Sequence, residues 1–372
     1  MVRETESAEN CPPPGDRSAL RHYLKALPKA ELHLHMEGSI RPQILLQLAD
    51  RNHLKLPFTQ PDECLHLYNY TSFREFANIL LMGVNCLRQP DDFFDVLFDM
   101  ATNMNEQNIR YAEITWTPQF YLNRGFPLDD ILAAMNAARE QALLRWGLEM
   151  RWIPDLVRSY PGPARLISEW ATSERAREGG VVALGLGGPE AGHPASGFAS
   201  YFQRAASLGL PANPHAGEGM GAQSIRETIS HLRPVRIGHG VRAIEDEQLV
   251  KYLAHHSIPL EVCLTSNIRL GVYSSYAEHP VKQLLDAGCA VTLNSDDPVL
   301  FQTTLTEEYL HAITDCGLPP NSITKTIIAA LQASYLPNDE KRTLSQAFEQ
   351  RFTELSQPTV DQPRETRAKS VS

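Results

Sequence analysis

Short apolar runs alternate with longer helix-like segments along most of the chain. Each run is rich in β-branched or aromatic residues and ends in a polar cluster, a pattern typical of strands buried in a parallel sheet. Eight runs predict strands, at 30–34, 111–115, 151–156, 181–186, 211–214, 236–238, 259–263 and 290–294. Helical patterns between them include 91–108, 128–146, 196–208 and 245–256. This alternation predicts a TIM-type (β/α)8 barrel, with the helices outside the strands.

An open, doubly wound sheet is the structural alternative. The dinucleotide-binding sheets of this kind carry a Gly-x-Gly-x-x-Gly turn after the first strand, and their ligands bind where the strand order reverses. No such turn follows 30–34, and the polar clusters of this chain follow many strands. The barrel is therefore the better prediction.

The composition is that of a globular protein with a large core. The 372 residues are 42% hydrophobic and 21% charged, and we expect one barrel domain at 18–355. Residues 1–17, acidic and proline-rich, predict a disordered arm, and 356–372 predict a disordered polar tail. The start of the chain lacks the basic and apolar segments of a signal peptide, and no apolar run of about 18 residues predicts a membrane span.

Charge and cysteine content narrow the partners and the compartment. The chain has 44 Asp and Glu against 34 Lys and Arg, a net charge of −10. This argues against nucleic acids and anionic membranes as partners, whereas a small neutral or cationic substrate is compatible with it. The 6 cysteines are scattered without a Cys-x-x-Cys pair, which favours reduced thiols and a cytoplasmic location. The sequence leaves the oligomeric state open.

Polar clusters follow the first, fifth, sixth, seventh and eighth predicted strands, where barrel active sites are built. His33 and His35 are two residues apart, so on a strand their imidazoles share one face. With His215 and Asp296 they provide three nitrogens and one oxygen, as in a catalytic zinc site with a position left for water. A lone histidine in a strand is usually a core residue, but clusters at the same end of several strands favour a site.

The order His35-Met36-Glu37 also opens the signature of cytidine-type zinc deaminases. That signature needs a later Pro-Cys-x-x-Cys motif to complete the metal site, and the chain has none. We therefore exclude that class.

Taken together and in this order, the clusters resemble the adenosine deaminase family of the amidohydrolase barrels. The resemblance covers about residues 25 to 335 and rests on the stretches 29–35, 215–218, 236–240, 261–267 and 294–298. It implies that His33, His35, His215 and Asp296 hold one zinc ion per chain. The predicted fourth strand has no lysine, a residue that often bridges two metals in other amidohydrolases. The segment 56–87 would form a helical lid after the first strand, which would exclude water from the site.

By the same resemblance, Glu218 and His239 would be catalytic. Glu218, kept protonated by burial, would donate a proton to ring nitrogen N1 of a 6-aminopurine, which makes carbon C6 electrophilic. His239 would take or orient the proton of the attacking water, Asp297 would bond ring nitrogen N7, and ammonia would leave. Glu218 and Asp297 could instead cap helices, since a carboxylate suits the first turn of a helix.

The residues near the sugar leave the choice of aminopurine open. Glu37 stands where adenosine deaminases usually carry aspartate, and it resembles the family's adenine and aminodeoxyfutalosine deaminases. Gly188, whose amide would meet ring nitrogen N3, and Gly238 match the nucleoside enzymes, although a tight turn and close packing would also explain them. We expect Asp297, Gly188, Glu37 and His35 to bind substrate. The preferred reaction is deamination of adenosine or deoxyadenosine, and the alternative substrates are adenine and aminodeoxyfutalosine.

Two other hypotheses compete with a purine deaminase. An amidohydrolase that cuts an amide or ester would use the same zinc site but would have no use for Glu218. A barrel that only binds its partner would be expected to have lost a metal ligand or Glu218, and none is lost here.

Overall fold

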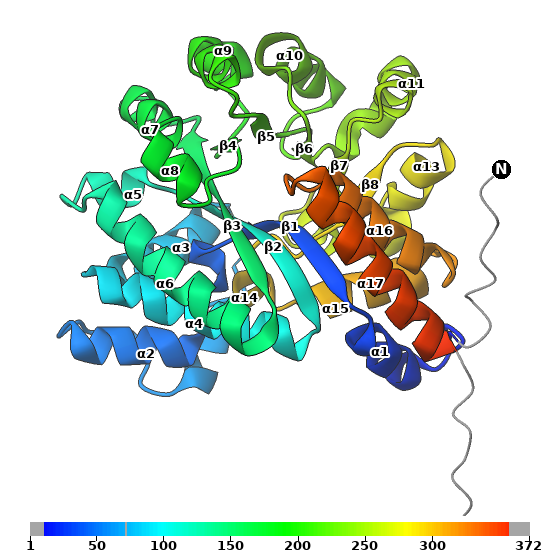
Figure 1. Cartoon of the computed structure of the whole chain (residues 1–372), viewed down its shortest axis with the longest axis horizontal. Helices are drawn as coiled ribbons and strands as arrows, with labels where there is room; N and C mark the ends of the chain where they lie inside the picture. Colours follow the sequence, from blue (N-terminus) through cyan, green and yellow to red (C-terminus); the bar gives the residue numbers. More distant parts are fainter. Residues whose placement is uncertain (1–10, 71–72, 357–372) are drawn as a thin grey trace, which may run out of the picture.

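The computed structural model describes residues 11–70 and 73–356 of the chain. In this part, eight parallel strands form one sheet in which neighbours follow chain order (Figure 1). They are β1 (Lys29–His35), β2 (Ile109–Trp116), β3 (Glu149–Val157), β4 (Leu184–Gly187), β5 (Ala212–Ala216), β6 (Ile237–His239), β7 (Leu260–Val262) and β8 (Val291–Leu293). The chain after β8 pairs with β1, because the N–H of His35 donates to the carbonyl of Asp296 (2.8 Å) and the N–H of Asp296 donates to that of His33 (3.1 Å). The predicted parallel barrel is confirmed.

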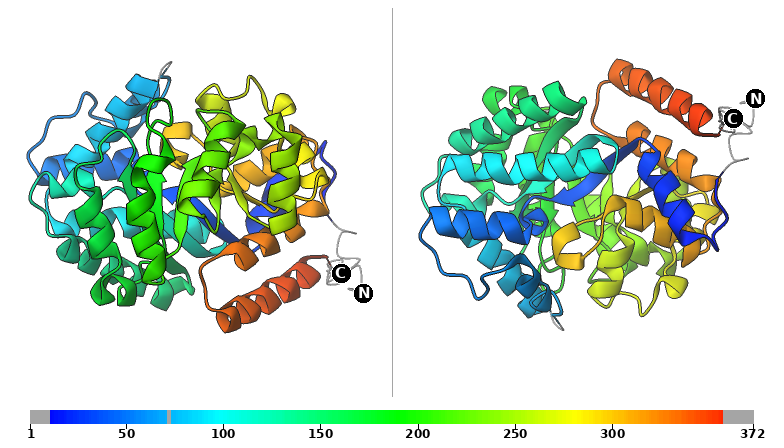
Figure 2. Two further views of the ribbon diagram at one scale, coloured as in Figure 1. Left: turned by 90° about the horizontal axis from the view of Figure 1, so that it is seen from above. Right: turned by 90° about the horizontal axis from the view of Figure 1, so that it is seen from below.

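The helices lie around the outside of the strands (Figures 1 and 2). Those of the first half are α1 (Arg17–Ala26), α2 (Pro42–Arg51), α3 (Phe73–Cys86), α4 (Pro90–Glu106), α5 (Gln119–Leu122), α6 (Leu128–Trp146), α7 (Ala164–Ala171) and α8 (Glu174–Glu178). Those of the second half are α9 (Ala199–Ser207), α10 (Ala222–Leu232), α11 (Glu247–His256), α12 (Leu264–Arg269), α13 (Val281–Asp286), α14 (Pro298–Phe301), α15 (Leu305–Thr314), α16 (Ser322–Ala333) and α17 (Asn338–Ser356). Short 3-10 helices are η1 (Glu37–Ser39), η2 (Pro61–His66), η3 (Ala195–Phe198), η4 (Val241–Glu245) and η5 (Tyr276–Glu278).

Local signals account for the helices that were predicted best. Helix α6 has the predicted bounds. Asp129 and Asp130 lie in its first turn, where their negative charges interact favourably with the positive end of the helix dipole. Gly147 ends the helix with a left-handed φ of 65°. The predicted helix 196–208 is instead divided into η3 and α9.

Strands β1 to β6 each end one or two residues later than predicted, and in β5 and β6 this changes where the site residues stand. The predicted strand 211–214 is β5, which includes His215, and the predicted strand 236–238 is β6, which ends with His239. In the parallel pairing of these strands, His215 lies opposite Gly238 and Ala216 opposite His239. Both histidines are therefore fixed by sheet hydrogen bonding rather than placed on mobile loops.

The segment of the predicted lid contains η2 and α3. Helix α3 contacts η1 at the carboxyl end of β1. The ring of Phe76 in α3 stacks on that of Phe301 in α14, with centroids 5.4 Å apart. The segment therefore packs beside the end of the barrel where the site was predicted; closure of this segment over a substrate stays a prediction.

The first and last helices lie close to the two ends of the described part of the chain. Helix α1 begins at Arg17, where Asp16 accepts a capping hydrogen bond, and α17 ends at Ser356. The predicted arm and tail fall mostly on 1–10 and 357–372, which lie outside the described residues; one domain at 18–355 stays a prediction. All 6 cysteines are described and none forms a disulfide. Among the described helices, none has the length and apolar character needed to cross a membrane.

Candidate active site

Five of the predicted site residues converge at the carboxyl end of the barrel. His33 and His35 lie in β1, His215 in β5 and His239 in β6, and Asp296 follows β8. One nitrogen or oxygen atom from each of His33, His215, His239 and Asp296 lies within 4.8 Å of the others. The Nε2 atom of His35 lies 3.1 Å from Nε2 of His215 and 3.4 Å from Oδ1 of Asp296. Residues far apart in the sequence thus form one buried His/Asp cluster.

The outer nitrogens of two rings are held by the barrel. Nδ1 of His33 donates to Oε2 of Glu261 (2.9 Å), and Nδ1 of His215 donates to the carbonyl of Leu186 (3.0 Å). Each ring therefore turns Nε2 toward the cluster, and in the described part of the chain the buried Nε2 of His33 has no hydrogen-bond partner. Burial lowers the pKa of His35 to about 4 and that of His215 well below its usual value, so both of these rings are neutral.

These features fit a metal site. Three imidazoles and one carboxylate oxygen are a common donor set for a divalent ion such as zinc. The hydrogen bonds to the outer ring nitrogens are the contacts that orient metal-binding histidines. The carboxylate of Glu261 stays charged: burial would raise its pKa, but Arg236 and His33 outweigh this and lower the pKa to about 2.

A chain of hydrogen bonds fixes the tautomer of His239. The N–H of Val281 donates to Nδ1 of His279 (3.2 Å), and Nε2 of His279 donates to Oδ1 of Asn267 (3.1 Å). The amide nitrogen of Asn267 can only donate, so it donates to Nδ1 of His239 (3.3 Å). Burial lowers the pKa of His239 to about 4, so the neutral ring carries its one proton on Nε2. This N–H faces Oε1 of Glu218, 3.6 Å away.

Glu218 follows β5 and reaches the same cluster. Burial raises its pKa to about 8, and the charges of Asp296 and Glu190 act in the same direction. The side chain is therefore a protonated acid at neutral pH. Helix α10 begins at Ala222 with Gly221 in the N-cap position, so Glu218 does not cap this helix.

Glu190 holds the loop that carries Glu218. Its Oε1 accepts from the N–H groups of Glu218 (2.9 Å) and Gly219 (2.8 Å), and its Oε2 accepts from that of Gly217 (3.0 Å). The hydroxyl of Ser224 also donates to this carboxylate. Burial raises the pKa of Glu190, but these hydrogen bonds outweigh burial and lower it, so the carboxylate is charged.

Asp297 is directed toward η1. It occupies the N-cap position of α14, with Pro298 as the first helical residue, but its side chain makes no capping hydrogen bond. A Cβ atom at Gly38 would lie 1.8 Å from Oδ1 of Asp297, so glycine is needed at this point of close approach. Burial raises the pKa of Asp297 well above its usual value, and the charge of Asp296 adds to this. Burial thus favours the protonated form of Asp297, the form that donates a hydrogen bond to a ligand.

Glu37, the first residue of η1, is tied to the end of β2. Its Oε1 accepts from the N–H of Thr117 (2.8 Å) and from the hydroxyl of Tyr121 (3.2 Å). Its Oε2 is buried and, within the described residues, has no hydrogen-bond partner. Burial raises the pKa of Glu37 to about 7. One oxygen of Glu37 is thus structural, and the other is available to a ligand.

The two glycines that suggested a nucleoside have local reasons of their own. Gly188 follows β4 with a left-handed φ of 84°, and an added Cβ would lie 3.1 Å from Cγ1 of Val157. A Cβ at Gly238 would lie 2.8 Å from Cε1 of His33 and 3.2 Å from Cγ of His215. A turn and tight packing therefore account for the two glycines locally, and binding of substrate by the backbone of Gly188 stays a prediction.

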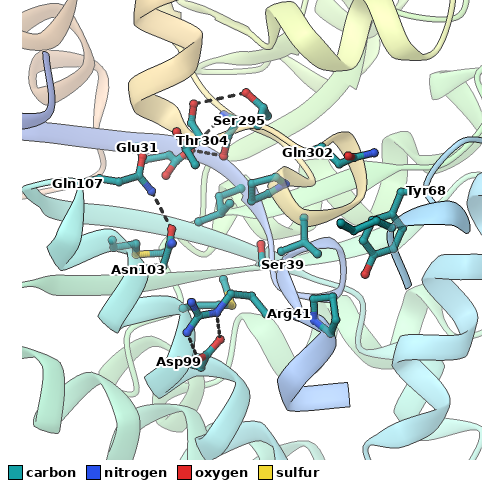
Figure 3. Close-up of a pocket in the computed structure, with 18 residues that line it drawn as sticks. Glu31, Ser39, Arg41, Tyr68, Asp99, Asn103, Gln107, Ser295, Gln302 and Thr304 are labelled. Carbon is teal, nitrogen blue, oxygen red and sulfur yellow. Dashed lines mark hydrogen bonds and ion pairs between the residues drawn. The ribbon is translucent and has the colours of Figure 1, made fainter. Parts of the chain in front are cut away.

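A separate cavity of about 320 Å³ lies between β1 and α4, and none of the predicted site residues lines it. Figure 3 shows Glu31 and Ser295 in its wall, with Asp99 of α4 paired to Arg41. Oε1 of Glu31 accepts from the N–H of Ser295 (3.0 Å), beside Asp296 in the chain. The cavity thus adjoins the cluster but is not formed by the groups of the candidate active site.

Sequence reasoning assigned no role to Glu190, Asn267, His279 or Asp155. Asn267 belonged to a polar cluster after the seventh predicted strand, but its partner His279 belongs to no motif. Asp155 was visible only as a charged residue inside an otherwise strand-like run, 151–156. These residues act through contacts between distant segments, which local patterns do not contain.

The chain is similar to known proteins over most of its length. The family model described as adenosine deaminase matches residues 28–350. The chain is 38% identical over 322 residues to an aminodeoxyfutalosine deaminase of Streptomyces avermitilis, covering 85% of this chain and 89% of that protein. It is 35% identical over 331 residues to an adenine deaminase of Crocosphaera subtropica, covering 87% and 99%.

A solved structure agrees with these relatives. The adenine deaminase from Arthrobacter aurescens matches with a TM-score of 0.82 and 28% identity, covering 87% of this chain and 98% of that one. These proteins bear the names of the alternative substrates of the sequence analysis, not of adenosine. The chain belongs to the adenosine deaminase family and is a deaminase, a hydrolase that acts on C–N bonds of purine-like substrates.

Proposed function

We propose that the chain catalyses the hydrolytic deamination of a 6-aminopurine, with aminodeoxyfutalosine as the substrate and adenine as the second candidate. The observation that carries the proposal is the position of Glu218, whose Oε1 lies 3.6 Å from Nε2 of His239 beside the His/Asp cluster. A protonated acid and a neutral N–H donor that face one metal-type cluster are suited to attack by water on an electron-poor ring carbon.

One zinc ion per chain is part of the proposal. His33, His35, His215 and Asp296 would hold it, since they supply the donor set described above. When bound, zinc lowers the pKa of a coordinated water toward about 7, which supplies the nucleophile at neutral pH. His239 lies in the same cluster but is left outside the proposed ligand set, because the hydrogen bond from Asn267 to its Nδ1 leaves its proton on Nε2.

The protein side chains would move the protons. Glu218 donates its proton to N1, which makes C6 electrophilic. The N–H of His239 orients the attacking oxygen and stabilises the charge that develops on it, so His239 acts as a donor rather than as a base. Asp297, a neutral acid, donates to N7. The water oxygen bonds to C6 and the C6–N bond to the amino group breaks. Of the two water protons, one leaves with ammonia and one replaces the proton that Glu218 gave.

The substrate choice rests on the relatives and on Glu37. The relatives are named for aminodeoxyfutalosine and adenine. By the family resemblance given in the sequence analysis, glutamate at position 37 fits both groups. Aminodeoxyfutalosine is placed first because the Streptomyces avermitilis protein is 38% identical over 322 residues. The glycines 188 and 238 carry no weight in this choice, since local structure explains them.

The test is a spectrophotometric panel on the zinc-loaded full chain. Aminodeoxyfutalosine, adenine, adenosine, deoxyadenosine and adenosine monophosphate are assayed separately for loss of the 6-amino chromophore and for released ammonia. Fastest turnover of aminodeoxyfutalosine supports the proposal. Fastest turnover of adenine would make adenine the substrate in its place. Turnover of none, with zinc bound, overturns it and favours an amide or ester hydrolase. Removal of zinc with a chelator should abolish activity, and added zinc should restore it.

A further inference from the structure

Arg158 is a buried cation that directly follows β3, and it has no carboxylate partner. The residue is 2% exposed. Among the described residues, no carboxylate lies within ion-pair distance of its guanidinium, and its buried Nε has no hydrogen-bond partner. Because a buried charge without a counter-ion opposes folding, the contacts that the guanidinium does make must offset this cost.

The guanidinium joins two neighbouring segments at the carboxyl end of the barrel. Its Nη1 donates to the carbonyl of His193 in the loop after β4 (2.9 Å), and its Nη2 donates to the carbonyl of His215 in β5 (2.8 Å). The backbone N–H of Arg158 donates to the carbonyl of Gly187, the last residue of β4 (2.9 Å). The planar fork of an arginine can serve two acceptors at fixed positions. Arg158 therefore fixes the loop after β4 against the strand that carries His215.

The loop that Arg158 fixes also carries Glu190. The N–H of His193 donates to the carbonyl of Glu190 (3.1 Å), so the two residues close one tight turn. From this turn, the carboxylate of Glu190 accepts from the N–H of Glu218 (2.9 Å). The hydrogen bonds thus run from Arg158 to the turn, and from the turn to the loop of Glu218.

The opposite charges of Arg158 and Glu190 support this arrangement without a direct ion pair. Burial lowers the pKa of Arg158, whereas the charge of Glu190 raises it. Burial raises the pKa of Glu190, whereas its hydrogen bonds and the charge of Arg158 lower it. Each of the two buried groups therefore favours the charged form of the other.

We propose that Arg158 is a positioning residue that, through the turn of His193 and Glu190, holds Glu218 in place beside the His/Asp cluster. The same guanidinium bonds the backbone of His215, a member of that cluster, so the acid and the cluster are fixed to one side chain. In the proposed reaction Glu218 has to meet N1 while the water oxygen meets C6, and a displacement of about 1 Å can cost about 100-fold in rate. The inference rests on the proposed function, since it takes Glu218 as the acid.

The experiment compares Arg158→Met and Arg158→Lys with the wild type in the zinc-loaded full chain. Steady-state kinetics use the aminopurine that the wild type turns over fastest, and zinc content is measured beside them. Arg165→Met, at an exposed position of α7, is the matched control and should leave all readouts unchanged. We expect kcat of both Arg158 variants to fall by about 10- to 100-fold, with KM changed less than about threefold. Zinc content should be unchanged, and lysine should not restore kcat, because one ammonium group does not replace the fork.

Hydrogen exchange followed by mass spectrometry tests the positioning without turnover. In the wild type the N–H groups of Glu218 and Gly219 are held by Glu190, so the segment 217–220 should be protected. In Arg158→Met this protection should fall by about tenfold or more, while that of β5 should persist. Unchanged exchange of 217–220 overturns the inference, whatever the change in kcat. Faster exchange throughout the chain, or loss of zinc, also overturns it, because Arg158 would then support the fold as a whole.

The two proposals fail separately. If the wild type turns over no aminopurine, the proposed function fails, and the exchange of 217–220 still decides whether Arg158 holds this loop. If the wild type is active and kcat of Arg158→Met equals that of the wild type, only this inference fails.

Discussion

The amide nitrogen of Asn267 lies 3.3 Å from Nδ1 of His239 and leaves the proton of this histidine on Nε2, toward the site. Asn267→Asp reverses this relationship, because a carboxylate accepts from Nδ1 and removes the proton from Nε2. We expect kcat to fall by about 100-fold or more, since a wrong tautomer in a catalytic histidine has a large effect. Nitrogen NMR of the labelled histidine reports the tautomer directly. Unchanged kcat with a reversed tautomer would show that His239 is no donor.

Glu261 is expected to tune the metal site through His33, whose Nδ1 donates to it at 2.9 Å. Glu261→Gln removes the charge that orients this ring and should weaken zinc binding by about 10- to 100-fold. Competition with a chromogenic chelator measures the affinity. Glu247→Gln on the exposed face of α11 is the control. Equal zinc affinity of Glu261→Gln and the wild type would show that the hydrogen bond from His33 to Glu261 does not strengthen zinc binding.

Glu218→Gln should lower kcat by about 100- to 10,000-fold, because glutamine cannot give a proton to N1. Zinc content and binding of the substrate should persist, since Glu218 is outside the proposed ligand set. Single-turnover assays with metal analysis check both. More than a tenth of wild-type activity would remove Glu218 from the role of acid and favour a reaction that needs the metal site alone.

Replacement of Glu190 is expected to lower the free energy of unfolding by an amount that depends on pH. Its pKa is lowered in the folded chain by hydrogen bonds from Ser224, Gly217 and Glu218, which outweigh burial. The stability that it contributes is therefore present above the unfolded pKa of about 4.3 and is lost as the pH falls through the lower folded value. Glu190→Gln should cost about 1–3 kcal/mol at pH 7.

Denaturant unfolding of both proteins between pH 3 and pH 7 tests this. The difference between wild type and variant should shrink below about pH 4, where the unfolded acid takes up its proton. A difference that stays constant over this range would mean that the charge of Glu190 is not the cause. Because Glu190 holds the loop of Glu218, kcat should also fall while zinc binding is kept.

Gly185→Ala should destabilise the fold by about 1–3 kcal/mol, because the new methyl group would lie 1.8 Å from Oδ1 of Asp155. In an Asp155→Ala background most of this loss should disappear. A double-mutant cycle by chemical denaturation measures the coupling between the two positions. Equal losses of unfolding free energy in both backgrounds would show that glycine is required at position 185 by another neighbour. Ile153 is one such neighbour, since its Cγ2 would be 3.2 Å from the added Cβ.

The sequence by itself determined the eight-strand barrel and the positions of the groups for metal chemistry. Apolar runs and their polar ends are local signals, and α6 shows how far they reach, since acidic residues at its start and Gly147 at its end set both bounds. His33 and His35 are paired by the period of a strand, so their convergence at the cluster follows from two residues of spacing.

Tertiary structure alone decided how these groups are used. The tautomer of His239 depends on Asn267 and His279, and the loop of Glu218 depends on Glu190, across contacts between segments that are separate in sequence. At Gly188 a positive φ, and at Gly238 the rings of His33 and His215, give the glycines a local reason that the sequence does not show. Side-chain orientation, hydrogen-bond direction and the fit of a carboxyl over glycine arise only when strands pack together, because no local pattern specifies which distant atom comes within 3 Å.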